Sequence, residues 1–142
     1  IESIHASAWR PQWSAYEHPN NTTGHLVFAC GARGHYLHTH DAARNTIDIQ
    51  IHGPRGALRY DGRQLTFNLR PQEQLGESPL EPVELVPARG EADLLRDFHA
   101  YITTGAEPGI SVRHNLETMA ACEMMCRSIA LERVVTRGEL DR

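Results

Sequence analysis

The sequence predicts an α+β fold, with an open-faced, predominantly antiparallel β-sheet and helices packed on one of its faces. Residues 45–70 contain three short stretches in which apolar and polar side chains alternate, separated by turns rich in Gly and Pro. Alternation with a period of two is typical of half-buried antiparallel strands. After residue 90 the apolar residues take helical spacing instead. Strands followed by helices indicate an α+β domain, and we expect one domain spanning residues 1–142.

The first forty residues are expected to supply three strands. Residues 3–9 alternate small apolar with polar side chains and predict the first strand, whereas residues 10–23 are polar and predict a loop. Residues 24–30 are apolar on both faces, so we expect a central strand there. A tight turn at residues 31–34 would then allow residues 35–40 to pair with that strand as a hairpin.

The meander of residues 45–70 is expected to have two different faces. Three isoleucines would lie on one face, and Arg59 and Thr66 would contribute to the polar face opposite. We expect the helices to cover the isoleucine face, which leaves the polar face free for a second copy of the chain or for a ligand. The isoleucines are Ile47, Ile49 and Ile51, and they alternate with Asp48, Gln50 and His52.

Turn sequences divide and end the meander. Gly53-Pro54-Arg55-Gly56 and Asp61-Gly62 supply the residue types that tight turns between strands require. Beyond the meander, residues 73–82 are polar and are expected to form a loop, and residues 83–86 are expected to add an edge strand.

Two helices are expected in the last third of the chain. The first spans residues 91–104 and ends at Gly105. Ser111 is expected to cap a longer helix that reaches about Glu132, and residues 134–135 are expected to form a last short strand. The apolar face of the first helix contains Leu94, Leu95, Phe98 and Ile102, and that of the second contains Leu116, Met119, Ala120, Cys122, Met124, Cys126 and Ile129.

Composition excludes several classes of protein. The net charge of −4 argues against nucleic-acid and acidic-membrane partners, and no apolar run approaches the about 18 residues of a membrane span. Cys30, Cys122 and Cys126 are too few for a disulfide framework, so we expect buried, reduced thiols and a cytoplasmic location. All 14 basic residues are Arg, which removes lysine catalysis and the P-loop.

The densest polar cluster lies around the third strand. His38 and His40 would share one face of this strand and His35 the other. His-x-His is a metal-ligand spacing in cupins, but the expected glycine is displaced and Arg44 or Asn45 stands where a Glu is needed. We therefore expect no bound metal. No serine lies in a G-x-S-x-G elbow, and no G-x-G-x-x-G follows a strand, so neither a nucleophilic serine nor a dinucleotide fingerprint is present.

Taken in order, these segments resemble the C-terminal domain of the Gfo/Idh/MocA oxidoreductases, the family of glucose–fructose oxidoreductase and inositol dehydrogenase. The resemblance rests on a pair of strands that meet at glycines near residue 31, on I-x-G-x-x-G-x-L at residues 51–58 and on F-x-x-x-I-x-x-G at residues 98–105. A last helix rich in small residues precedes Arg133-Val134. Together these motifs cover nearly the whole chain.

The resemblance implies a part of a larger NAD(P)-dependent enzyme. In that family an N-terminal Rossmann domain binds NAD or NADP, and the C-terminal sheet contacts a small-molecule substrate and commonly forms the subunit interface. The family's catalytic lysine and its D-x-x-x-H helix have no counterpart in this chain, which begins at Ile1 rather than Met. We therefore expect a fragment that lacks the Rossmann domain, binds no cofactor, contributes no catalytic residue and forms a homo-oligomer through its open sheet face.

Substrate contacts are expected from the polar cluster, because sugars and polyols are recognised by converging hydrogen-bond donors and acceptors. The candidates are His38, His40, Asp41 and Arg44, followed by Trp9 and Arg10. Two alternatives remain open from the sequence: a stand-alone, non-enzymatic module that dimerises or binds a ligand, and a small cupin-like metalloenzyme. The aromatic loop between Trp9 and Tyr16 fits a lid over a binding site and a hydrophobic anchor equally well.

Overall fold

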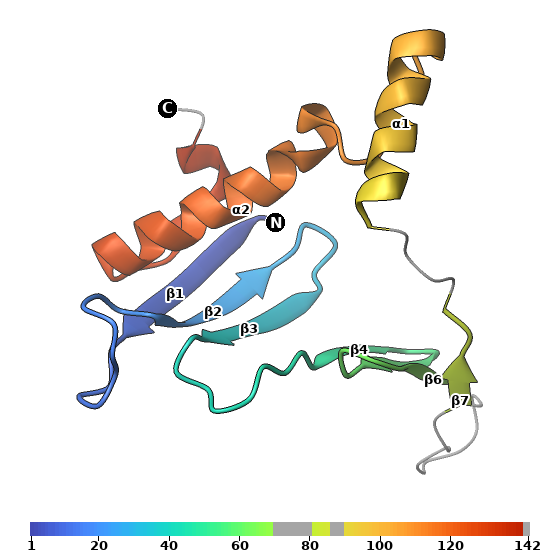
Figure 1. The fold of residues 1–142 in the computed structure, drawn as a ribbon. Helices are drawn as coiled ribbons and strands as arrows, with labels where there is room; N and C mark the ends of the chain where they lie inside the picture. Colours follow the sequence, from blue (N-terminus) through green and yellow to red (C-terminus); the bar gives the residue numbers. More distant parts are fainter. Residues whose placement is uncertain (70–80, 86–89, 141–142) are drawn as a thin grey trace. The chain divides into compact units, whose positions relative to one another are not determined.

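The computed structural model describes residues 1–69, 81–85 and 90–140 (Figure 1). The chain forms two compact units, of which the first combines Ile1–Ala42 with Asp97–Arg142 and the second is Ala43–Arg96. Within these residues, each unit contains one four-stranded antiparallel sheet, and there are two α-helices. The predicted α+β class with an open antiparallel sheet is confirmed. The division of the strands between two sheets was not predicted.

The first sheet has the strand order β3-β2-β1-β8. Strand β1 (Ser3–Trp9) has the predicted bounds, and β2 (Asn21–Val27) lies between β1 and β3 (Arg33–Thr39), as expected for a central strand. The short strand β8 (Val135–Thr136) pairs with β1 at the other edge. The β2–β3 hairpin turns at residues 28–32 rather than at the predicted residues 31–34, and the Gly31 amide donates to the Phe28 carbonyl at 2.8 Å within this turn.

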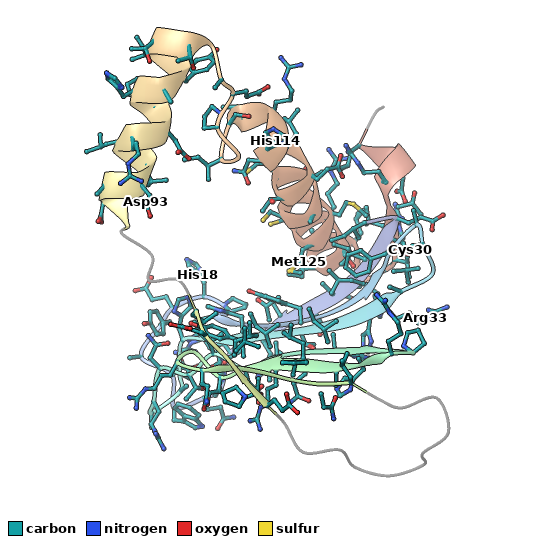
Figure 2. All side chains as sticks on the ribbon, turned by 90° about the vertical axis from the view of Figure 1, so that its right-hand side faces the viewer. His18, Cys30, Arg33, Asp93, His114 and Met125 are labelled. Carbon is teal, nitrogen blue, oxygen red and sulfur yellow. The ribbon has the colours of Figure 1, made fainter. Side chains whose placement is uncertain are left out.

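Helix α2 (Val112–Leu131) covers one face of this sheet (Figure 1). It begins where predicted, since the Ser111 hydroxyl accepts a hydrogen bond from the His114 amide at 3.3 Å, and it ends at Glu132 in a left-handed conformation. Met125 points from the helix towards the sheet (Figure 2), and the absence of a side chain at Gly24 makes room for it. The core consists of Ile4, Ala6, Met124 and Val135.

The buried face of α2 differs from the one predicted. Ala120, Met124 and Ser128 are buried at intervals of four residues, whereas Cys122 and Cys126 are exposed. Two residues correspond to about 200° around a helix, so the cysteines lie well away from the buried stripe. Cys30 is also exposed, in the turn after β2. The prediction of three buried cysteines is therefore wrong.

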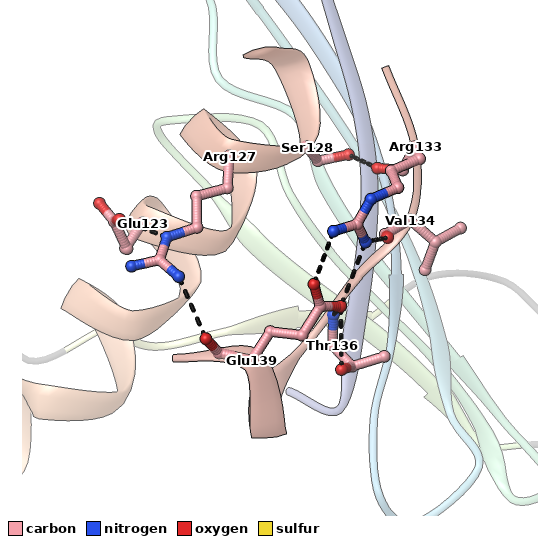
Figure 3. A network of polar contacts seen from close by, with 7 residues as sticks. All are labelled: Glu123, Arg127, Ser128, Arg133, Val134, Thr136 and Glu139. Atoms are coloured by element: carbon pink, nitrogen blue, oxygen red, sulfur yellow. Dashed lines mark hydrogen bonds and ion pairs between the residues drawn. The ribbon is translucent and has the colours of Figure 1, made fainter. Parts of the chain in front are cut away.

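Polar contacts close the first unit at the end of α2 (Figure 3). The Ser128 hydroxyl accepts from the Ala6 amide of β1 at 2.8 Å and donates to the Arg133 carbonyl. Arg133 donates to the Glu139 carboxylate at 2.8 Å, and the Thr136 amide donates to the same carboxylate at 3.0 Å. These bonds join the end of α2, the edge strand β8 and the short 3₁₀ turn Arg137–Glu139.

The second sheet is the predicted meander, with the strand order β4-β5-β6-β7. Its strands are β4 (Ile49–Gly53), β5 (Gly56–Tyr60), β6 (Leu65–Leu69) and β7 (Glu81–Val83). The register confirms the two predicted faces: Ile51 lies beside Leu58 and Phe67, whereas Gln50 lies beside Arg59 and Thr66. The edge strand exists but begins two residues earlier than predicted. Residues 73–80 of the predicted loop and Val86 lie outside the described residues.

The isoleucine face of this sheet is only partly buried. Ile47, Ile49 and Ile51 are 52%, 49% and 60% exposed. Helix α2 packs on the Ile4 face of the first sheet, within the first unit. The main apolar core therefore lies in the first unit, although its strand β1 has the weaker hydrophobic pattern.

Helix α1 (Glu91–Thr104) has the predicted bounds, and Gly105 follows it with a positive φ of 75°. Its apolar side chains are exposed, with Phe98 at 59% and Ile102 at 66%. Neither helix within the described parts of the chain is long and apolar enough to cross a membrane.

Candidate substrate-binding site

A polar cluster forms where the loop between β1 and β2 meets the end of β3. Asp41, two residues beyond β3, is at its centre. One of its carboxylate oxygens accepts from the Ser14 hydroxyl at 2.9 Å, and the other accepts from the Asn21 amide at 2.8 Å. Ser14 and Asn21 are 6% and 3% exposed. Asp41 therefore links the loop between β1 and β2 to Asn21, the first residue of β2.

The surroundings of Asp41 keep it ionised. Burial raises the pKa of its carboxyl group, but the side-chain amides of Asn21 and Asn20, the Ser14 hydroxyl and the charge of Arg10 lower it by more. The net pKa lies below the usual value for Asp. Asp41 is therefore an ionised carboxylate at neutral pH, and its oxygens can accept further hydrogen bonds.

Arg10 orders the loop from the side of β1. Its guanidinium group donates to the backbone carbonyls of Tyr16 and, at 3.2 Å, of Ser14. The Tyr16 amide in turn donates to the Ser14 hydroxyl at 3.2 Å. Because these bonds close within the loop, residues 10–16 form a folded rim beside the end of β3.

His38 lies on β3 and His40 one residue beyond it, and their side chains meet on one side of the chain, as the sequence predicted. Their Nε2 atoms are 3.1 Å apart, and their rings meet edge to face with centroids 4.5 Å apart. The Tyr36 ring is parallel to that of His38 at 6.3 Å, and the Tyr16 ring lies 5.8 Å from that of His40. Both histidines are exposed.

The other candidates occupy different places. Trp9 ends β1 beside the cluster; the residue is 43% exposed, and its carbonyl accepts from the Asn21 side-chain amide at 3.4 Å. Arg44 is exposed and belongs to the second unit, so the cluster as described consists of the other five candidates. The predicted separation of His35 from His38 is confirmed, since His35 packs edge to face on His25 instead.

Sequence reasoning missed three members of this cluster: Ser14, Tyr16 and Asn21. The Asn20-Asn21 pair was assigned to the loop, but Asn21 opens β2 and pairs with Trp9. The available signal was the asparagine alone, since Asp41 lies 20 residues away in the sequence. The Asn21 amide needs a partner, and Asp41 supplies one.

The cluster is suited to hydrogen bonding rather than to nucleophilic chemistry. It combines imidazole rings, a carboxylate and phenol groups beside exposed aromatic surface, which is a composition suited to polyhydroxylated ligands. Within residues 1–69, 81–85 and 90–140, no group of three or more His, Cys, Asp or Glu side chains is placed to hold a metal ion.

Comparison with solved structures finds the same fold in oxidoreductases. The aldose-aldose oxidoreductase of Caulobacter crescentus, complexed with glycerol, matches 95% of this chain with a TM-score of 0.77 and 19% identity. An oxidoreductase of Agrobacterium radiobacter in complex with NAD⁺, L-tartaric acid and magnesium matches 99% with a TM-score of 0.76 and 19% identity. A levoglucosan dehydrogenase in complex with NADH and levoglucosan matches 95% with a TM-score of 0.74 and 18% identity.

The chain shares its fold with part of the Gfo/Idh/MocA-type oxidoreductases. The resemblance expected from the motifs is thus confirmed as a resemblance of fold. The chain spans only 41% to 44% of the length of these three proteins. No protein-family model and no curated protein matches the sequence.

Proposed function

We propose that this chain is the substrate-side and oligomerisation domain of an NAD(P)-dependent oxidoreductase that acts on a sugar, a polyol or a related hydroxy compound. The observation that carries the proposal is the fold match, which extends over 95% or more of this chain but over less than half of each oxidoreductase. The named ligands of those proteins, glycerol, L-tartaric acid and levoglucosan, all carry hydroxyl groups. The polar cluster at the end of β3 offers matching hydrogen-bond partners.

In the proposed reaction the substrate loses a hydride from a carbinol carbon to the nicotinamide ring and a proton from the hydroxyl group. The cofactor supplies the hydride chemistry, and protein groups orient the substrate. We assign His38 and His40 to the substrate hydroxyls, because both rings are exposed beside an ordered rim. Asp41 and Arg10 hold that rim and have hydrogen-bonding capacity left. Trp9 and Arg44 remain candidates for contacts at its edge.

Cofactor binding is assigned to a Rossmann domain outside this chain, and proton transfer to a lysine and a histidine there. This chain alone should therefore not bind NADH. Titration of the chain with NADH, followed by nicotinamide fluorescence, is expected to show no saturable change. Binding with micromolar affinity would overturn the assignment of the cofactor site to another domain.

Self-association is assigned to the polar face of the second sheet, which includes Gln50, Arg59 and Thr66. Arg59 forms a two-bond ion pair with Asp48 at 3.1 and 3.2 Å, and both side chains are about half exposed. Sedimentation equilibrium should show dimers or larger species that Arg59→Glu dissociates. A monomer at high micromolar concentration would contradict this part of the proposal.

The direct test of the oxidoreductase function uses the full product of the gene. Reduction of NAD⁺ and NADP⁺ is followed at the nicotinamide absorbance with a panel of aldoses, polyols and hydroxy acids. Turnover of at least one hydroxy compound with one nicotinamide cofactor is expected. A gene product that neither binds nor reduces either cofactor would leave a non-enzymatic binding module as the better account.

A further inference from the structure

The exposed side chains of His38, on β3, and His40, one residue beyond it, have the spacing of two ligands on one metal ion. Their Nε2 atoms are 3.1 Å apart. Two imidazole nitrogens that bind one ion at about 2.0–2.1 Å, with an angle of about 90–110° between them, are about 2.9–3.4 Å apart. The observed separation falls within that interval without any movement of β3.

The arrangement of the rings agrees with a shared ion. The centroids are 4.5 Å apart. Two rings that converge on one ion have centroids about 5 Å apart, and a straight N–H···N bond at the same nitrogen distance places them farther apart, at roughly 5.4 Å. The rings therefore converge, and a metal ion can replace the proton that one neutral ring shares with the other. This exchange requires both Nε2 atoms to be unprotonated.

We propose that His38 and His40 form a two-histidine chelate for a divalent transition metal such as Zn²⁺, Ni²⁺ or Cu²⁺, the ions that imidazole ligands favour. The protein supplies two ligands, and the remaining positions face solvent, where water or a ligand oxygen completes the coordination. The Tyr36 and Tyr16 rings lie beside the pair, with centroids 6.3 Å from His38 and 5.8 Å from His40. Metal binding by this pair does not depend on the proposed oxidoreductase function.

The chain contains its own control. His25 and His35 lie on the opposite face of the same sheet, also edge to face, with centroids 4.6 Å apart. Because this second pair has similar exposure and ring separation, His35→Gln measures how much binding comes from exposed histidines in general. All of these side chains are exposed, so the variants are expected to fold, and circular dichroism checks this.

The test is calorimetric titration of chelator-treated chain with Zn²⁺ at pH 7.5. We expect wild type and His35→Gln to bind about one equivalent, and His38→Gln and His40→Gln each to bind at least about tenfold more weakly, since each loses one of two ligands. Absence of binding by wild type, or equal affinity in all four proteins, overturns the proposal.

A second measurement identifies the nitrogens directly. Nuclear magnetic resonance of histidine side chains labelled with ¹⁵N should show Zn²⁺ shifting the Nε2 signals of His38 and His40 but not those of His25 and His35. Shifts spread evenly over all the histidines would mean adventitious binding and would contradict the proposed site.

Discussion

Ser128 is the single side chain on which the joint between α2 and β1 depends most. It is fully buried, accepts from the Ala6 amide and donates to the Arg133 carbonyl. Ser128→Ala leaves both backbone groups without this partner, so we expect a loss of about 1–3 kcal/mol in the free energy of unfolding. Urea denaturation measures it.

Thr103→Ala is the matched control for this substitution. It also removes a hydroxyl group that donates to a backbone carbonyl, but Thr103 is exposed on α1. We expect it to cost less than about 0.5 kcal/mol. Equal losses for Ser128→Ala and Thr103→Ala would show that the buried hydroxyl group does not stabilise the contact between α2 and β1.

Glu139 makes part of the stability dependent on pH. Hydrogen bonds from Arg133 and from the Thr136 amide lower the pKa of Glu139 from 4.5 to about 2. Since the folded pKa is the lower one, the stabilisation is complete above about pH 4.5 and is lost as the pH falls towards 2. The stability advantage of wild type over Glu139→Gln should therefore be constant above pH 5 and shrink between pH 4.5 and 2.

The partner of Glu139 provides the control for this pH dependence. In an Arg133→Met background the largest cause of the lowered pKa is gone. The effect of Glu139→Gln should then change much less between pH 5 and 2.5 when urea unfolding is measured at each pH. An undiminished change would show that the ion pair is not its source.

At the same scale, burial was the property that the sequence predicted least well. Ser128 is buried because two backbone groups need its hydroxyl, and a search for apolar stripes passes over such a residue. Cys122 and Cys126 were assigned to the core by residue type, and the register of α2 placed them in solvent. Asn21 and Ser14 were missed in the candidate site for the reason that Ser128 was missed in the core.

At the level of elements, the sequence predicted boundaries better than it predicted packing. Residues 91–104 and 3–9 form the expected helix and strand, because Gly105 and the loop from Arg10 supply unambiguous end signals. The partner of each face could not be predicted, since an alternating pattern shows that one side is apolar but not what covers it. The isoleucine meander accordingly looked like the core, whereas the observed core lies between β1, β8 and α2.

Substitutions on the two sheets test which face is buried. Ile4 is fully buried under α2, so Ile4→Ala should cost about 2–5 kcal/mol in the free energy of unfolding. Ile49 is 49% exposed, so Ile49→Ala should cost at most about 1 kcal/mol. Thermal and urea unfolding compare the two variants. A larger loss for Ile49→Ala would restore the meander as the principal core.

The turn between β4 and β5 depends on one glycine of its motif more than on the other. A Cβ atom at Gly56 would lie 2.0 Å from the Asn68 carbonyl oxygen, and its φ is 152°. A Cβ atom at Gly53 would lie 3.9 Å from the Gly56 carbonyl oxygen, which is an ordinary van der Waals contact. We expect Gly56→Ala to cost more than about 2 kcal/mol and Gly53→Ala less than about 1 kcal/mol. Similar losses in urea unfolding would contradict a steric role specific to Gly56.

At the scale of the whole molecule, the fold could be predicted more fully than the site. The fold class and the resemblance to Gfo/Idh/MocA-type oxidoreductases could be predicted, because turn glycines and helix ends occur in a fixed order along the chain. The site could be predicted only in part. Its histidines and Asp41 are adjacent in sequence, but the loop that meets them comes from 27 residues earlier, as the Ser14–Asp41 bond shows.

The most direct test of the central claim is the effect of His38→Gln on the full gene product, measured as KM and kcat for its hydroxy substrate. The account predicts that KM rises at least about tenfold, because a hydrogen-bonding group of the site is altered. His35→Gln, on the other face of the same strand, should leave KM unchanged. Equal KM values for wild type and both variants would contradict the assignment of the β3 histidines to substrate binding.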